Sequence, residues 1–139
     1  METLSRFKDK LIMVTGAGSG IGKSVAIRIA KEGGNLILHD INGTNLEKTT
    51  AEITTNSNKI YNICCDIREE DHLKQEVSKI ADDFGFIHAL SHNAGILKSY
   101  KTDQMKVADF KKILDVLKLV ARIKKIFLSK KENSKGEDS

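Results

Sequence analysis

The sequence predicts an α/β fold built on a doubly wound parallel sheet. Short apolar segments alternate with longer segments whose apolar residues recur every three or four positions, which is the order of strand–helix–strand units. The first apolar segment, residues 11–15 (LIMVT), resembles a strand that is covered on both faces. A glycine-rich turn follows it at once and leads into a helical pattern.

Composition limits the class of protein. A chain of 139 residues suits one domain, and 40% hydrophobic with 30% charged residues is an ordinary globular composition, unlike that of a disordered or membrane protein. No apolar run approaches the ~20 residues of a membrane span, and residues 1–10 lack a secretory pattern, so we expect a cytoplasmic protein. The net charge is +4, and residues 118–131 hold six basic and no acidic side chains. Without interleaved aromatic residues this stretch reads as a solvated helix face, so we expect neither nucleic acid nor a membrane as a partner.

The elements follow in order along the chain. A helix is expected from about Ile21 to the glycine pair 33–34, and then a strand at 35–40 (NLILHD). Thr44 and Glu47 have capping-box spacing, which predicts a helix that starts near Thr44 and fades in the polar run TTNSN.

The next unit starts with a strand at 59–65, in which the adjacent Cys64 and Cys65 are expected to be buried thiols rather than disulfide or metal partners. Asp66 and Glu69 repeat the capping spacing and open a helix that Gly85 ends. The fourth strand is expected at 86–92.

The last expected helix covers residues 103–128, and the polar tail 129–139 is expected to be disordered. The helix presents a broad apolar side formed by Phe110, Ile113, Leu114, Leu117, Val120 and Phe127. The predicted organisation is thus one α/β domain, residues 1–128, with about four strands and four to five helices.

The glycine-rich turn, TGAGSGIG at residues 15–22, carries the strongest chemical signal. Glycine lets the chain turn sharply, lets a pyrophosphate approach the backbone, and brings helix against strand. The helix N-terminus then offers N–H groups and a positive dipole end to phosphates. In this strand–turn–helix context the motif predicts a Rossmann unit that binds a dinucleotide; the alternative is a tight turn with no ligand.

Asp40 ends the second strand, 18 residues after Gly22, where a carboxylate can accept both ribose hydroxyls of the adenosine. The alternative is an aspartate that only forms the turn before residues 41–43.

The glycine spacing T-G-x-x-x-G-x-G, through Gly16, Gly20 and Gly22, resembles that of the short-chain dehydrogenase/reductase family. NADP-preferring members usually place a basic residue before the second glycine or after the second strand. Here those positions hold Ser19 and Ile41, so the resemblance implies NAD over NADP.

Two further turns match the family. The pair Asp66-Ile67 follows the third strand, and the resemblance implies that this aspartate lies beside the adenine ring; a helix cap would also explain it. Residues 92–95 (HNAG) resemble the family turn NNAG, with His92 as a structural substitute for asparagine. The expected cofactor-binding residues are Gly16, Ser19, Gly20, Ile21, Gly22, Asp40, Asp66, Ile67, Asn93, Ala94 and Gly95, and no metal ligand is expected.

The resemblance breaks near residue 116. The family reads D-V-N-L where this chain reads Asp115-Val116-Leu117-Lys118, so the catalytic asparagine is absent. The catalytic serine and the Tyr-x-x-x-Lys pair are absent too, because Tyr61 and Tyr100 are the only tyrosines and neither has a lysine four residues on. The resemblance implies an NAD-dependent oxidoreductase of which this chain supplies the cofactor-binding half and is inactive alone. The alternatives are an NAD-binding or interaction module and a non-functional truncated product.

The family strand order runs 3-2-1-4-5-6-7, which would leave the strand at 86–92 on an edge of this chain. Its backbone groups, with apolar residues such as Ile87 and Leu90, would be open to pairing. Self-association through this edge or the last helix is therefore expected.

Overall fold

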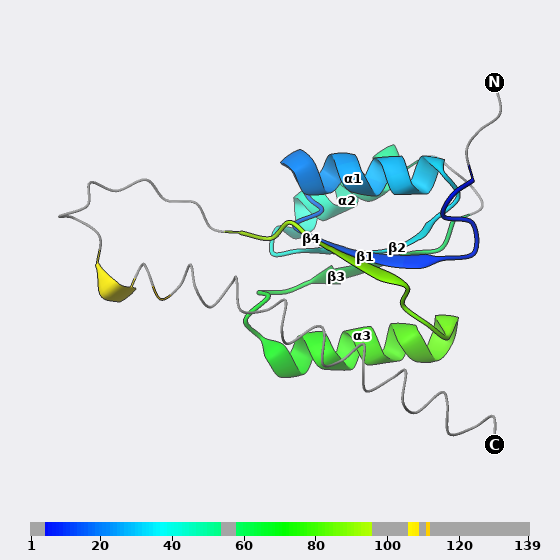
Figure 1. Ribbon diagram of the computed structural model, residues 1–139. Coiled ribbons are helices and arrows are strands. Elements are labelled where there is room, and N and C mark those ends of the chain that lie inside the picture. Colours follow the sequence, from blue (N-terminus) through cyan, green and yellow to red (C-terminus); the bar gives the residue numbers. More distant parts are fainter. Residues whose placement is uncertain (1–4, 54–57, 96–105, 109–110, 112–139) are drawn as a thin grey trace, which may run out of the picture.

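A computed structural model describes residues 5–53, 58–95, 106–108 and 111 (Figure 1). Its centre is a parallel sheet of four strands in the order β3-β2-β1-β4, all of whose neighbouring pairs run parallel. The strands are β1 (Leu11–Thr15), β2 (Asn35–Asp40), β3 (Ile60–Cys64) and β4 (Ala89–His92). This order confirms the expected doubly wound Rossmann topology.

Three helices cover the two faces of the sheet. Figure 1 shows α1 (Gly20–Lys31) and α2 (Gly43–Glu52) on one face and α3 (Glu70–Phe84) on the other. All five residues of β1 are buried, and their side chains alternate between the faces: Met13 packs with the α3 cluster and Val14 with the α1–α2 cluster. Because the strands are parallel, their carboxyl ends lie together on one side of the sheet.

The end of α1 is fixed by backbone and charge together. Gly33 has a φ of +85°, and the N–H of Gly34 donates to the carbonyl of Ile29 at 3.0 Å, so the glycine pair ends the helix as expected. Glu32, whose side chain is only 4% exposed, accepts from Arg28 at 2.6 Å and from Arg6 at 2.5 and 2.6 Å. This carboxylate ties the chain before β1 to the end of α1.

Both capping-box predictions need correction. The helix α2 begins one residue earlier than expected because Asn42, not Thr44, is its cap: the Asn42 side chain accepts from the N–H of Asn45 at 3.0 Å. Glu69 reaches back to the N–H of Asp66 at 3.3 Å, but the Asp66 carboxylate takes the N–H of Arg68, and α3 starts only at residue 70. Asp66 thus shapes a turn ahead of the helix rather than capping it.

Other expectations fail locally. Cys65 is buried but Cys64 is exposed, because successive residues of an extended chain point to opposite sides and only Cys65 points into the α3 cluster. The fourth strand is shorter than expected, and the Ile87 side chain, expected to be open, is only 6% exposed and packs in the α3 cluster. Of the expected last helix, residues 107, 108 and 111 are helical; its apolar side and the tail 129–139 lie outside the described residues. Within the described part of the chain, no helix combines the length and apolarity that crossing a membrane requires.

Candidate functional site

One pocket lies where the strands of the sheet end, beside the start of α1, with a volume of about 590 Å³. Parallel α/β sheets bind ligands at this carboxyl edge. All eleven residues expected from the sequence line it, together with three that the sequence reasoning did not select: His39, Ile41 and Arg68. The residues come from four separate turns, which the sheet order brings together.

Close backbone contacts explain two of the glycines. Gly16 has a φ of +67°, and a Cβ there would lie 2.8 Å from the carbonyl carbon of Asn93. A Cβ on Gly22 would lie 2.1 Å from the carbonyl oxygen of Gly16. These two positions let the turn, α1 and the chain after β4 approach one another, and a side chain at either would push the pocket wall apart.

The N-terminus of α1 opens on the pocket without a built-in anion. Ser19 is the N-cap residue, yet its side chain makes no capping hydrogen bond, and the first turn contains no acidic residue. A Cβ on Gly20 would meet nothing within 4 Å, so the space above the turn is open. Free N–H groups and the positive end of the helix dipole therefore point at an accessible space, which suits a phosphate group.

Asp40 joins two turns at the next part of the pocket. Its Oδ2 accepts from the N–H of Gly18 at 2.8 Å, and its Oδ1 accepts from the N–H of Asn42 at 2.9 Å. The turn-forming role considered from the sequence is therefore present. Each carboxylate oxygen can accept a second hydrogen bond, so the same group can also bind a ligand diol.

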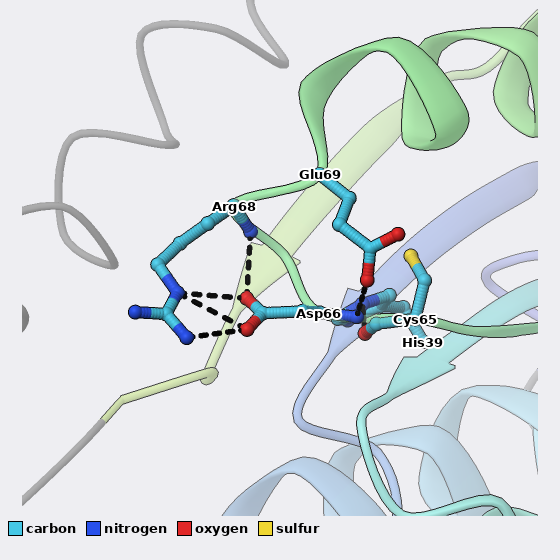
Figure 2. Close-up of polar contacts among 5 residues, drawn as sticks. All are labelled: His39, Cys65, Asp66, Arg68 and Glu69. Atoms are coloured by element: carbon cyan, nitrogen blue, oxygen red, sulfur yellow. Dashed lines mark hydrogen bonds and ion pairs between the residues drawn. The ribbon is translucent and has the colours of Figure 1, made fainter.

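Asp66 and Arg68 form a tight pair on the pocket wall (Figure 2). The guanidinium Nε lies 3.0 Å from Oδ1 and 3.1 Å from Oδ2, and Nη2 lies 2.5 Å from Oδ2. The hydrogen bond from Arg68 lowers the pKa of Asp66, so this carboxyl is ionised at neutral pH. Arg68 is the only lysine or arginine among the described residues lining this pocket. Its position is not one of the two, those of Ser19 and Ile41, at which NADP-preferring members of the family usually place a basic residue.

The turn after β4 is fixed by the hydroxyl of Thr15. This Oγ1 accepts from the N–H of Asn93 at 3.1 Å and of Ala94 at 3.2 Å, and it lies 2.8 Å from His92 Nδ1. Since the hydroxyl accepts two N–H groups, we assign its proton to the bond with His92, whose Nδ1 then accepts. Burial lowers the pKa of His92, consistent with a neutral ring. Its hydrogen bond to Thr15 gives His92 the structural role expected of it, and it does not line the pocket.

His39 is a second buried imidazole, and it is only 2% exposed. Its Nε2 lies 2.9 Å from the carbonyl oxygen of Cys65, so this nitrogen carries the proton and donates it (Figure 2). Burial lowers the pKa of His39 and keeps the ring neutral. Its other nitrogen, Nδ1, is buried and has no hydrogen-bond partner among the described residues.

No described residue in this pocket is a tyrosine that could act as the general acid. Tyr61 donates to Asp83 at 2.5 Å, which raises the pKa of Tyr61 to about 12, and it does not line the pocket. A tyrosine that delivers a proton at neutral pH needs the opposite shift. Among the described residues, no three His, Cys, Asp or Glu side chains are grouped as metal ligands.

The residues present suit a dinucleotide on structural grounds. A glycine cradle and an uncapped helix N-terminus provide for the pyrophosphate, and a fixed carboxylate provides for a ribose diol. The end near Asp66 has both an exposed isoleucine, Ile41, and polar groups suited to a base. The order of these features along the pocket matches the order of groups in such a ligand.

Comparisons with known proteins agree with this geometry. The family model described as short chain dehydrogenase matches residues 10–135. Levodione reductase from Leifsonia aquatica is 31% identical over 115 residues, which are 81% of this chain and 43% of that protein. Cyclohexanol dehydrogenase from Acinetobacter sp. (strain SE19) is 32% identical over 113 residues, 81% of this chain and 45% of that protein. The chain therefore spans less than half the length of these curated relatives.

Solved structures show the same likeness. The citronellol catabolism dehydrogenase AtuB of Pseudomonas aeruginosa PAO1 superposes with a TM-score of 0.77 at 33% identity, over 88% of this chain and 52% of that one. NAD⁺-bound xylitol dehydrogenase superposes with a TM-score of 0.80 at 30% identity, over 88% of this chain and 48% of that one. By sequence and by fold, this chain belongs to the short-chain dehydrogenase/reductase family of oxidoreductases.

Proposed function

We propose that this chain forms the NAD-binding half of an oxidoreductase that passes hydride between nicotinamide and a carbonyl or alcohol carbon. The observation that carries the proposal is the single pocket lined by all eleven residues expected from the cofactor motifs. The NAD⁺-bound state of a related xylitol dehydrogenase supports the choice of ligand class.

Each part of the pocket has a separate task in this proposal. The N–H groups at the start of α1 bind the pyrophosphate, with Gly16 and Gly22 keeping the approach open. Asp40 accepts from the adenosine ribose, and Asp66 lies beside the base. The turn 93–95 borders the nicotinamide half and stays in place because Thr15 holds it. The bound nicotinamide supplies the hydride chemistry, and the protein supplies orientation.

Three finer points belong to the same proposal. NAD is preferred over NADP, because a carboxylate at Asp40 would repel a 2′-phosphate and neither Ser19 nor Ile41 is basic. Support comes from the two backbone N–H groups that hold this carboxylate. The protein is cytoplasmic. It associates with a second copy or another chain through the edge of β4, which within the described residues pairs only with β1, or through the last expected helix.

The test is a calorimetric titration of the purified chain with NADH and with ADP-ribose. We expect saturable 1:1 binding and a rise in Tm with ligand, because a ligand at 100 times its Kd stabilises the folded state by about 2.7 kcal/mol. A folded chain that shows neither heat of binding nor a change in Tm at millimolar ligand would contradict the proposal. Binding without turnover is the result expected of the cofactor-binding half on its own.

A further inference from the structure

The glycine turn is attached to two parts of the fold through one peptide group, the one between Ala17 and Gly18. The hydroxyl of Thr49, on α2, donates to the carbonyl of Ala17 at 2.9 Å. The N–H of Gly18 donates to Oδ2 of Asp40 at 2.8 Å. In a trans peptide the C=O and the N–H point in opposite directions, so Thr49 and Asp40 hold this group from its two sides. A chain of hydrogen bonds therefore runs from α2 to the carboxylate proposed to bind the ribose.

Burial makes the hydrogen bond from Thr49 important. Thr49 and Ala17 are both 0% exposed, so the Ala17 carbonyl depends on a partner within the protein. The Thr49 oxygen also lies 3.2 Å from the carbonyl of Asn45, one turn earlier in α2. A hydroxyl has one proton, and within a helix the Asn45 carbonyl has the backbone N–H of Thr49 as its regular donor. We therefore assign the hydroxyl proton to the bond with the nearer Ala17 carbonyl.

The turn also packs closely against Asp40 and α2 at this point. A Cβ on Gly18 would lie 2.8 Å from Asp40 Oδ2 and 2.9 Å from the Cβ of Asn45. Without the Thr49 hydroxyl, the buried carbonyl of the turn would lose this bond, which costs free energy in the present orientation of the peptide group. Rotation of that group towards another partner would withdraw the Gly18 N–H from Asp40. The orientation of the carboxylate therefore depends on a hydroxyl that does not touch it.

We propose that Thr49 is a positioning residue for the selection between NAD and NADP. Through the peptide group 17–18 it fixes one oxygen of the Asp40 carboxylate, while the N–H of Asn42 holds the other. Hydrogen bonds in such a chain polarise one another, so the Thr49 hydroxyl also makes the Gly18 N–H a stronger donor. The inference rests on the proposed function. It places part of the selectivity on α2, at a side chain that is not among the described residues lining the pocket.

The test measures Kd for NADH and NADPH by calorimetry in Thr49→Val, which removes the hydroxyl, and in Thr49→Ser, which keeps it. Thr50→Val is the matched control, because the Thr50 hydroxyl bonds Leu46 in its own helix at 3.0 Å and Asn62 at 3.1 Å rather than the turn. We expect Thr49→Val to lower the ratio of the NADPH Kd to the NADH Kd by about 3- to 10-fold, the effect of one hydrogen bond. Thr49→Ser and Thr50→Val should keep the wild-type ratio, even though the buried methyl group lost in Thr49→Ser lowers Tm.

A double-mutant cycle separates this role from general support of the fold. In Asp40→Asn, which lacks the carboxylate, adding Thr49→Val should leave the ratio unchanged; an equal effect of Thr49→Val in both backgrounds would overturn the proposal. It would also be overturned by an equal loss of NADH and NADPH affinity in Thr49→Val, or by a ratio in Thr49→Ser as low as in Thr49→Val.

Thermal unfolding checks that each variant folds, and Thr49→Ala takes the place of Thr49→Val if the latter does not. An unchanged ratio in the folded variant overturns this inference alone. A wild type that binds neither cofactor overturns the proposed function and this inference with it.

Discussion

Replacing Asp40 by asparagine should remove the preference for NADH over NADPH. The structure fixes the Asp40 carboxylate with bonds of 2.8 and 2.9 Å from the backbone of Gly18 and Asn42, so the group cannot swing away from a phosphate. A hydrogen bond to a charged group contributes roughly 1.5–3 kcal/mol. In NADPH the 2′-phosphate replaces a hydroxyl, so the complex lacks one such bond, and about 1.5–2 negative charges lie against the carboxylate. The wild-type preference should therefore be about 2 kcal/mol or more, or about 30-fold in Kd.

Asparagine is a better probe than alanine at this position. It keeps one side-chain acceptor for the two turns, whereas alanine removes the bonds to Gly18 and Asn42 together and mixes loop disorder with ligand binding. Calorimetric or fluorescence titrations should give a raised Kd for NADH, a lowered Kd for NADPH and a ratio near one. Asp71→Asn, an exposed change on α3 with the same change in net charge, is the control. Equal Kd values for the two cofactors in the wild type, or an unchanged ratio in Asp40→Asn, would refute the reasoning.

Four other predictions follow from the described contacts. Ser19→Asp should raise Tm slightly, because aspartate is a better helix cap, and should weaken NADH binding at least tenfold, because it repels the pyrophosphate. The neutral variant Ser19→Asn is the control for the cap. Equal NADH affinity in both variants would count against the phosphate site. Hydrogen bonds from Arg6 and Arg28 lower the pKa of Glu32 to about 2 from an ordinary value of 4.5, so its stabilisation is complete above about pH 5 and is lost as the pH falls towards 2. Tm measured from pH 7 to pH 2 should fall more steeply for the wild type than for Glu32→Gln, and parallel curves would exclude this contribution. Light scattering should show concentration-dependent association, owing to the open edge of β4; a monomer at every concentration would argue against it. The 139-residue chain alone should turn over ketones or alcohols below about 1 s⁻¹ in NADH assays, and faster turnover would show that the missing motif is not needed.

The sequence predicts most of the fold because its strongest signals are local and agree with one another. The apolar run of β1, the glycine turn and the periodic face of α3 each specify their element without reference to the rest of the chain. The errors occur where neighbouring groups compete for the same bond. Thr44 has the spacing of a cap, but Asn42 lies two residues earlier with an equally suitable side chain. The sequence alone does not show which of these two side chains caps the helix.

The candidate site shows the same division. All eleven motif residues line the pocket, because the turns after parallel strands must meet at one edge. Arg68 and His39 were missed for different reasons, because the partner of His39 lies across the fold and that of Arg68 does not. For His39 that partner is the Cys65 carbonyl, 26 residues away. For Arg68 the partner is local, an aspartate two residues earlier in the turn after the third strand, but the position of Arg68 on the pocket wall required the structure.

The hydroxyl of Thr15 has a consequence for the order in which the molecule assembles. It joins β1 to His92, Asn93 and Ala94, which follow it by 77 to 79 positions in the sequence. The backbone of Asn93 occupies the space that a side chain at Gly16 would need. During synthesis on the ribosome, the glycine turn therefore emerges long before the segment that completes it. The first strand pairs can form early, but a competent phosphate cradle has to wait for residue 95. Cofactor binding should therefore appear only when the segment after β4 has docked on the glycine turn. A nascent chain that is halted before β4 should contain secondary structure but should not bind the ligand.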